Sequence, residues 1–325
     1  MAKRILKSNE CVLIVLIAVL LVAFYTVNPA VLSLGNVFSM CSSATLNAIF
    51  ALPVLLIFVS GGIDLSFMAI ASFIMFTTTK ILLNNNWNPS IVIVFLIGIG
   101  MGIGLGCINA LFVNAIKLPI FIVTLATQFL FDGSILAFVG TGKQVVPGKM
   151  ADFGKMALLQ IESDGGRIST LRATVLIVVV LYILIWLLLW HTRLGRNFYL
   201  IGGDMQAAER AGINVKKTYV LLFVIVGAIC GIGGIVNACT LRTVIAGDLI
   251  GGEMPVIAAV IIGGANAEEG KGNVVATLLG VILITVISNN LTILKVPSYM
   301  QEFILGIFII LSTVSQVLRN RQKYR

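Results

Sequence analysis

The stretch LGRNFYLIGGDMQAAERAGINVKKT, residues 194–218, is a long polar segment that lies between strongly apolar ones. It predicts a short helix outside the membrane. Asp204 is a suitable N-cap, because its carboxylate can accept backbone N–H groups at the helix start, and Gly212 suits the left-handed residue after the helix. Ile213 is expected to fold back onto Ala208. A helix of about two turns is marginal alone in water, so it needs a surface to pack on.

The same helix carries small side chains at Ala207, Ala208 and Ala211. A face of this kind fits closely into a groove on another protein. The alternative interpretation is an ordinary surface helix between two membrane spans.

The composition places this segment in a membrane protein. Of the 325 residues, 59% are hydrophobic and only 11% are charged, which is too little polar surface for a water-soluble domain. Apolar runs of about 20 residues, the length that crosses a bilayer as a helix, recur from end to end. The net charge of +9 does not indicate nucleic-acid binding, because Lys and Arg gather at the ends of apolar runs, as the positive-inside rule expects.

These patterns predict an all-α, polytopic membrane protein with about ten transmembrane helices, a short cytoplasmic helix and both ends in the cytoplasm. The expected spans are 11–27, 44–59, 67–83, 91–116, one following Pro119 and reaching about 139, 171–190, 219–237, 249–264, 273–294 and 303–318. Residues 28–42, 84–88 and 140–170 are expected outside. The eighth segment is short, so a full crossing and a buried half-helix both stay open, although the basic C-terminal tail favours ten crossings.

Glycines in the fourth span recur at a spacing that favours close helix packing. They form G-x-x-x-G pairs in two registers, and the seventh span carries one more pair. The residues are Gly98, Gly100, Gly102, Gly104 and Gly106 in the fourth span, and Gly227 and Gly231 in the seventh.

Motifs for catalysis or cofactor binding are lacking in the sequence. The segment GTGKQ, residues 140–144, lacks the first glycine and the hydroxyl residue of a nucleotide-binding loop. The five cysteines have no metal-ligand spacing. His191 lies at a span end, and Asp132 is a lone acid without a basic partner, which is weak support for ion coupling. We therefore expect no catalytic residues, no metal and no cofactor.

Amide side chains within the spans suggest a route for a neutral, hydroxyl-rich solute. Membrane amides seldom face lipid, so Asn109, Gln128 and Asn289 are expected to border a central path. The alternative for each is a hydrogen bond that joins two helices.

Four motifs, in matching order and spacing, resemble the membrane permeases of bacterial carbohydrate ABC importers of the ribose, galactose and autoinducer-2 type. They are GGIDLS at 61–66, IFIVTLAT at 120–127, GRNFYLIGGDMQAAERAGI at 195–213 and IAAVIIGG at 257–264. The resemblance covers almost the whole chain, residues 1–325, and implies a single permease domain. Two departures, Phe67-Met68-Ala69 after GGIDLS and Glu269 in the later glycine-rich turn, bear on substrate identity.

This resemblance implies a transport subunit of a binding-protein-dependent system of the bacterial cytoplasmic (inner) membrane. The implied partners are two ATP-binding subunits, an extracytoplasmic solute-binding protein, a second permease copy or paralogue, and membrane lipid, with no nucleic acid. The resemblance also implies that the short cytoplasmic helix is a coupling helix, which links the permease to the ATPase. The residues that it assigns to this helix are Gly202, Gly203, Asp204, Ala207, Ala208 and Gly212.

The expected function is thus the permease subunit of an ATP-driven importer, which forms the path for a monosaccharide or similar small polar solute. The alternatives are a self-sufficient, ion-coupled secondary transporter and, more remotely, a membrane-embedded enzyme. An enzyme would need titratable groups clustered at one depth, which the sequence does not offer. The sequence leaves open which solute is carried and whether the permeases pair as a homodimer or a heterodimer.

Overall fold

The computed structural model describes residues 9–116, 118–163, 167–297, 299–308 and 310, and within them it is a helical membrane protein. Eight helices are long and apolar enough to cross a bilayer. They are α2 (Asn9–Val27), α3 (Leu34–Val59), α4 (Phe67–Asn84), α5 (Ile91–Ile116), α6 (Ile120–Ser134) with its π-helical extension η2 (Ile135–Val139), α8 (Thr174–His191), α11 (Val215–Leu241) and α13 (Val274–Ile293). The prediction of an all-α polytopic protein is confirmed.

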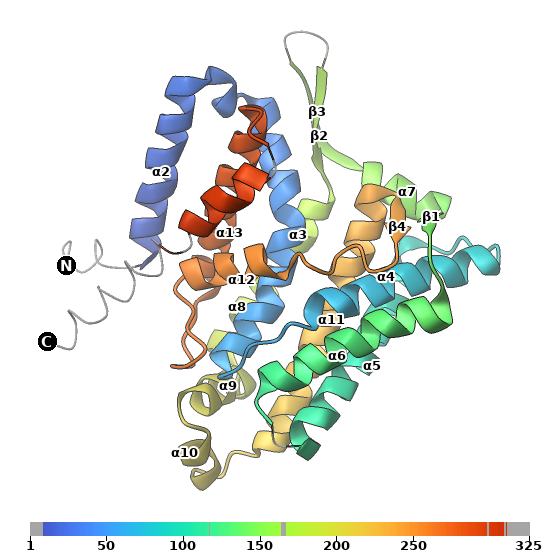
Figure 1. Ribbon diagram of the computed structural model, residues 1–325, viewed down its shortest axis with the longest axis vertical. Coiled ribbons are helices and arrows are strands. Elements are labelled where there is room, and N and C mark those ends of the chain that lie inside the picture. The colour runs from blue at the N-terminus through green and yellow to red at the C-terminus, as the bar shows by residue number, and fades with distance from the viewer. Residues whose placement is uncertain (1–8, 117, 164–166, 298, 309, 311–325) are drawn as a thin grey trace, which may run out of the picture.

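The remaining elements are short and lie mostly at the two ends of the bundle. They are the 3-10 turn η1 (Pro29–Leu32), α7 (Gly148–Lys155), α9 (Arg193–Gly203), α10 (Met205–Arg210), α12 (Glu253–Ile262), β1 (Lys143–Val145), β2 (Ala157–Ser163), β3 (Arg167–Arg172) and β4 (Thr243–Ile245). Strand β1 pairs antiparallel with β4, and β2 with β3. Figure 1 shows the β2–β3 hairpin at one end of the molecule and α10 at the other. The positive-inside rule assigns the α10 end to the cytoplasm.

Two boundaries differ from the sequence prediction. The outer loop predicted over 28–42 is shorter, because α3 begins at Leu34, where the Ser33 side chain accepts the N–H of Asn36 as an N-cap. The loop predicted over 140–170 is also largely structured, by β1, α7 and the hairpin. The tenth predicted span, 303–318, lies mostly outside the described residues.

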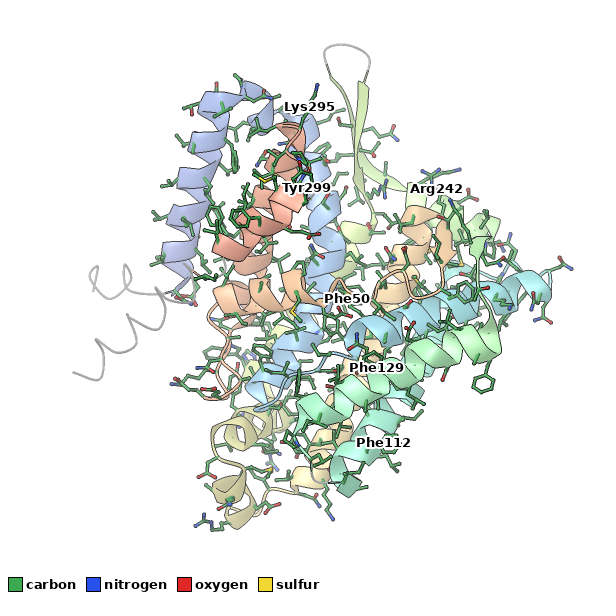
Figure 2. All side chains as sticks on the ribbon, viewed as in Figure 1. Phe50, Phe112, Phe129, Arg242, Lys295 and Tyr299 are labelled. Carbon is green, nitrogen blue, oxygen red and sulfur yellow. The ribbon has the colours of Figure 1, made fainter. Side chains whose placement is uncertain are left out.

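The centre of the bundle is formed by α3, α4 and α11. Helix α11 lies along α5 and also packs on α4 and α3. Phe50 of α3 is fully buried, whereas Phe129 of α6 is 69% exposed; Figure 2 labels both residues. Apolar side chains on such outward faces are suited to lipid, so their exposure is expected of a membrane span.

Helices α5 and α11 meet through a row of glycines. A methyl group built on Gly102 would collide with the carbonyl oxygen of Gly227, and one built on Gly98 with Ile235. A methyl group built on Gly106 would collide with the Phe223 carbonyl oxygen. By contrast, Gly100 and Gly104 have no atom within 4 Å of such a group. Close packing is thus confirmed, in the 98-102-106 register, and we call this contact the α5–α11 seam.

The eighth predicted span consists of two parts with different conformations. Strand β4 lies at the outer end, paired with β1, and the chain then runs through turns over 246–252 before α12 begins at Glu253. Helix α12 has 10 residues, or about 15 Å, half of the bilayer's hydrocarbon core. Its far end lies beside the start of α2, since the Gly263 carbonyl accepts a hydrogen bond from Asn9 at 3.3 Å; the positive-inside rule assigns that end to the cytoplasm. We call residues 246–262 the broken crossing.

Candidate functional site

The cytoplasmic loop between α8 and α11 contains two helices, where the sequence predicted one. Helix α10 is the predicted helix: the Asp204 carboxylate accepts the Ala207 N–H at 3.0 Å, and Gly212 has φ +85°. Ile213 also returns to the helix, since its N–H donates to the Ala208 carbonyl at 3.1 Å. The additional helix, α9, begins where the Thr192 hydroxyl accepts the Gly195 N–H.

The predicted coupling residues fall into an exposed set and a buried set. Gly203, Asp204, Ala207 and Gly212 are exposed, whereas Gly202 and Ala208 are buried within this chain. Ala208 is 4% exposed and packs with Ile201 and Val215, the first residue of α11. It therefore holds α10 against the chain's own helices, and only the exposed set can contact another protein directly.

Gly202, at the end of α9, lies where three separate turns of the chain meet. A methyl group on Gly202 would collide with the Val59 carbonyl, and would lie 2.9 Å from both Gly61 N and Gly270 Cα. Gly61 has φ +82° and Gly270 has φ +59°, values that favour glycine. We call Gly61, Gly202 and Gly270 the glycine junction. It joins the cytoplasmic loop to the α3–α4 turn and to the turn that follows α12.

A hydrogen bond beside the junction strengthens the same connection. The Tyr199 hydroxyl of α9 donates to the Gly272 carbonyl at 2.9 Å. Burial raises the pKa of this phenol, so it stays a neutral donor at physiological pH. This hydrogen bond therefore links α9 directly to the turn that follows the broken crossing.

Within the α3–α4 turn, Asp64 is the centre of a buried polar cluster. Its Oδ1 accepts hydrogen bonds from the backbone N–H and the hydroxyl of Ser66, at 2.6 and 2.7 Å. Asn109 Nδ2 in turn donates to Ser66 Oγ at 2.7 Å. Asp64 Oδ2 and Asn109 Oδ1 have no hydrogen-bond partner among the described residues. Desolvation by burial raises the pKa of Asp64 to about 6, and the Ser66 hydrogen bonds oppose this rise.

A second polar cluster joins α6 to the broken crossing. Gln128 Nε2 donates to Glu253 Oε1 at 3.1 Å, and Glu253, the first residue of α12, is only 5% exposed. One turn further along α6, Asp132 approaches Gly247: a methyl group there would lie 3.1 Å from Asp132 Oδ1. Gln128 Oε1 is buried and has no partner among the described residues.

A third cluster lies near the outer ends of α3 and α13. Asn289 Nδ2 donates to Asn36 Oδ1 at 2.6 Å, and Asn36 Nδ2 donates to Asn290 Oδ1 at 3.3 Å. Asn36 also donates to the Val31 carbonyl at 2.7 Å, which ties the α2–α3 turn to this group.

The three predicted path residues thus occupy three clusters at different depths. Asn109 belongs to the inner cluster, Gln128 to the middle one and Asn289 to the outer one. Each also joins two segments of this chain, which was the alternative interpretation. The sequence analysis did not single out Glu253, Asn36 or Asp64 as site residues. Glu253 could have been found from the sequence, because it is a carboxylate at the start of an apolar segment that is too short to span the membrane.

Comparison with known proteins gives a consistent result. Residues 36–313 match the family described as branched-chain amino acid transport system / permease component. The ribose import permease protein RbsC of Escherichia coli (strain K12) is 28% identical over 312 residues, which cover 95% of this chain and 92% of the relative. The probable ABC transporter permease protein YphD of the same strain is 30% identical over 310 residues, 95% of this chain and 90% of the relative.

The autoinducer 2 import system permease protein LsrD of Escherichia coli (strain SMS-3-5 / SECEC) is 28% identical over 331 residues, 99% of this chain and 96% of the relative. No solved structure matches the chain. The family match covers most of the chain, and its members are transport components, not enzymes. The chain is a multi-pass membrane protein that belongs to the branched-chain amino acid transport system / permease component family.

Proposed function

We propose that this chain is the membrane-spanning subunit of an ATP-driven importer and forms the path for a monosaccharide or similar hydroxyl-rich solute. The observation that carries this proposal is the glycine junction, which connects an exposed cytoplasmic loop to two turns of the membrane domain. A loop of this kind is what a partner ATPase needs in order to act on the path. The described residues contain no cluster of titratable side chains able to hold a metal ion.

Helix α10 is the proposed docking element for the ATPase. It is too short to be stable alone, and it is held by the Asp204 cap, the Gly212 stop and the buried Ala208. Ala207 on this helix and Gly203 shortly before it are exposed and offer a smooth surface. On this proposal Gly202 and Ala208 act indirectly, by holding the loop against the membrane helices.

The solute is proposed from the clusters and from the relatives. Amide and carboxylate side chains at three depths supply hydrogen-bond acceptors and donors of the kind that sugar hydroxyls use. The names of two relatives specify ribose and autoinducer 2, whereas the family description specifies branched-chain amino acids. Asn109, Gln128 and Asn289 remain the proposed path residues. They would bind hydroxyl groups better than the apolar side chain of such an amino acid.

The proposed complex contains two permeases, two ATP-binding subunits and a solute-binding protein outside the membrane. Co-expression with the ATPase and binding protein, followed by reconstitution into liposomes, tests this assembly. We expect ribose uptake that depends on ATP and on all components, and no uptake by the permease alone. Uptake by the permease alone, driven by an ion gradient, would instead establish the secondary transporter. Preferred uptake of leucine would refute the sugar and leave the importer intact.

The docking role of α10 needs a substitution on its exposed side. Ala207→Arg places a long charged side chain on that side without disturbing the chain's own packing, whereas Ala208→Arg would also disrupt the loop itself. We expect Ala207→Arg to insert normally but to lose co-purification of the ATPase and solute-stimulated ATP hydrolysis. Gln206→Arg, a neighbouring exposed position, tests whether added charge alone has this effect. Normal ATPase binding by Ala207→Arg would refute docking through this side of α10.

A further inference from the structure

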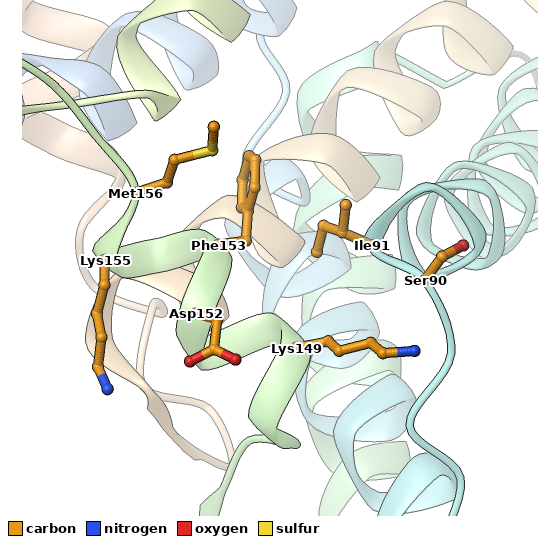
Figure 3. A pocket seen from close by; sticks show the side chains of 7 residues that line it. All are labelled: Ser90, Ile91, Lys149, Asp152, Phe153, Lys155 and Met156. Atoms are coloured by element: carbon orange, nitrogen blue, oxygen red, sulfur yellow. The ribbon is translucent and has the colours of Figure 1, made fainter.

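A groove on the outer face of the molecule lies between α7 and the start of α5. It has a volume of about 550 Å³ and is lined by Ser90, Ile91, Lys149, Asp152, Phe153 and Lys155, together with Met156. In Figure 3 the Lys149 side chain extends toward Ser90 and Ile91, whereas the Lys155 side chain points away from them. The backbone N–H of Lys149 donates to Asn88 Oδ1 at 3.2 Å, which fixes α7 beside the start of α5.

A second, apolar cleft continues from this groove into the membrane. Its volume is about 460 Å³, and it lies between α5, α8 and α11, with Phe95, Ile99, Val180, Leu184 and Ile232 among its lining residues. Ile91 and Phe153 line both cavities. The Phe153 ring packs edge-on against Phe95, with ring centroids 5.8 Å apart. The polar groove and the apolar cleft therefore adjoin.

The depth of the cleft matches one leaflet of a bilayer. From Ile91 at the outer start of α5 to Ile99 is a rise of about 12 Å, close to half of a hydrocarbon core about 30 Å thick. Val180 and Leu184 are 54% and 53% exposed, so the cleft is open toward the surrounding lipid. An acyl chain can enter it from the side.

The charges at the mouth of the cleft favour an anionic head group. Among the described residues, neither Lys149 nor Lys155 forms an ion pair, and both are exposed. With Asp152, the groove carries one net positive charge. The lysines suit a phosphate, and the Asp152 carboxylate can accept hydrogen bonds from head-group hydroxyls.

We infer that the groove and cleft together bind one anionic phospholipid of the outer leaflet, such as phosphatidylglycerol. The phosphate lies against Lys149 and Ser90, the head-group hydroxyls reach Asp152, and an acyl chain occupies the cleft beside Phe95 and Phe153. This inference does not depend on the proposed transport function, because it concerns the opposite face of the molecule from α10.

Native mass spectrometry of the purified full-length chain tests the inference. The chain is titrated with phosphatidylglycerol, phosphatidylethanolamine and phosphatidylcholine that have identical acyl chains. We expect phosphatidylglycerol to bind most tightly, and Lys149→Ala to weaken that binding about fivefold, the effect of roughly 1 kcal/mol per basic residue at a membrane surface. Lys143→Ala removes an exposed outer-face charge away from the groove and should leave the affinity unchanged.

The cleft is tested separately. Val180→Trp fills it, whereas Val179→Trp changes a neighbouring side chain of similar exposure that does not line it. We expect only Val180→Trp to reduce lipid binding. Equal affinity for the three lipids, or equal effects of Lys149→Ala and Lys143→Ala, would show that lipid surrounds the protein without a specific site. If inorganic phosphate displaces the lipid while Val180→Trp has no effect, the groove binds a soluble anion and the inference is wrong.

Discussion

The α5–α11 seam and the broken crossing differ in how their backbone polar groups are kept from contact with lipid. In the seam, two unbroken helices satisfy their own backbone and approach through Gly98, Gly102 and Gly106. In the broken crossing, the outer half has no helix, and polar side chains such as Gln128 lie beside it. Non-helical backbone is tolerated at membrane depth only where protein or a cavity surrounds it. The comparison indicates that the seam contributes close helix packing, whereas the broken crossing has polar side chains beside it that can form hydrogen bonds.

The largest effect is expected from filling the seam. Gly102→Leu forces backbone apart on both helices, so we expect a loss of roughly 3 kcal/mol or more in stability, at the upper end of the range for overpacking. Gly104→Leu, on the open register of the same helix, should change stability by less than about 1 kcal/mol. Thermal unfolding of the purified variants measures both. Equal destabilisation would mean that the register of the seam is wrong.

The Asp64 cluster, which joins the α3–α4 turn to α5, should make stability depend on pH. Burial raises the Asp64 pKa from 3.8 to about 6, so the folded state favours the protonated carboxyl. This contribution is fully present below pH 3.8 and is lost as pH rises to about 6. It amounts to about 3 kcal/mol on the relation between pKa and free energy. Asp64→Asn should flatten thermal stability between pH 4 and about 6. An unchanged pH profile would contradict the buried, shifted carboxyl.

Two adjacent glycines at the end of α9 have different surroundings. Gly202 is buried in the glycine junction, which contacts the turn after the broken crossing, whereas Gly203 is exposed on the surface of the loop. Gly202→Ala should cost about 2 kcal/mol by collision with backbone and should uncouple ATP hydrolysis from transport. Gly203→Ala adds the same methyl group where no atom of this chain lies within 4 Å, so it should keep the stability of the wild type, and any effect on coupling would arise at the docking surface instead. The measurement is solute uptake per ATP hydrolysed in the reconstituted complex. Normal coupling in Gly202→Ala would remove the glycine junction from the mechanism.

The smallest effect is expected at the middle cluster. Glu253→Ala leaves the Gln128 amide without its partner, at about 1 to 2 kcal/mol for a buried donor. Glu253→Gln keeps an oxygen that can accept the same hydrogen bond, so its stability should stay within about 1 kcal/mol of the wild type. A loss of uptake in Glu253→Gln with stability retained would show that the carboxylate charge itself serves the path. Identical stability for all three proteins would show that the Gln128–Glu253 hydrogen bond does not stabilise the fold.

Much of this fold was predictable because apolar length and charge placement determine membrane topology. The Asp204 cap and the Gly212 stop followed from local chemistry, which needs no knowledge of distant residues. The register of the seam could not be predicted from the sequence. Gly102 and Gly104 are both glycines of one helix, and only the structure shows that Gly102 faces α11 whereas Gly104 does not. The glycine junction was also hidden, because its members lie far apart in the sequence and only tertiary packing brings them together. Glu253 was visible as a charge, but its partner on α6 was not.

The glycines of the seam also affect how the molecule can move. Where backbone lies directly against backbone, as at Gly102 and Gly106, there are few side-chain rotamers to rearrange. We therefore expect α5 and α11 to move as one rigid body, together with the outer helix α7, whose Gly154 lies against the Cys239 carbonyl of α11. Relative motion is left to the segments that pack against this body, so distances measured by spin labels across α5 and α11 should stay constant through a transport cycle.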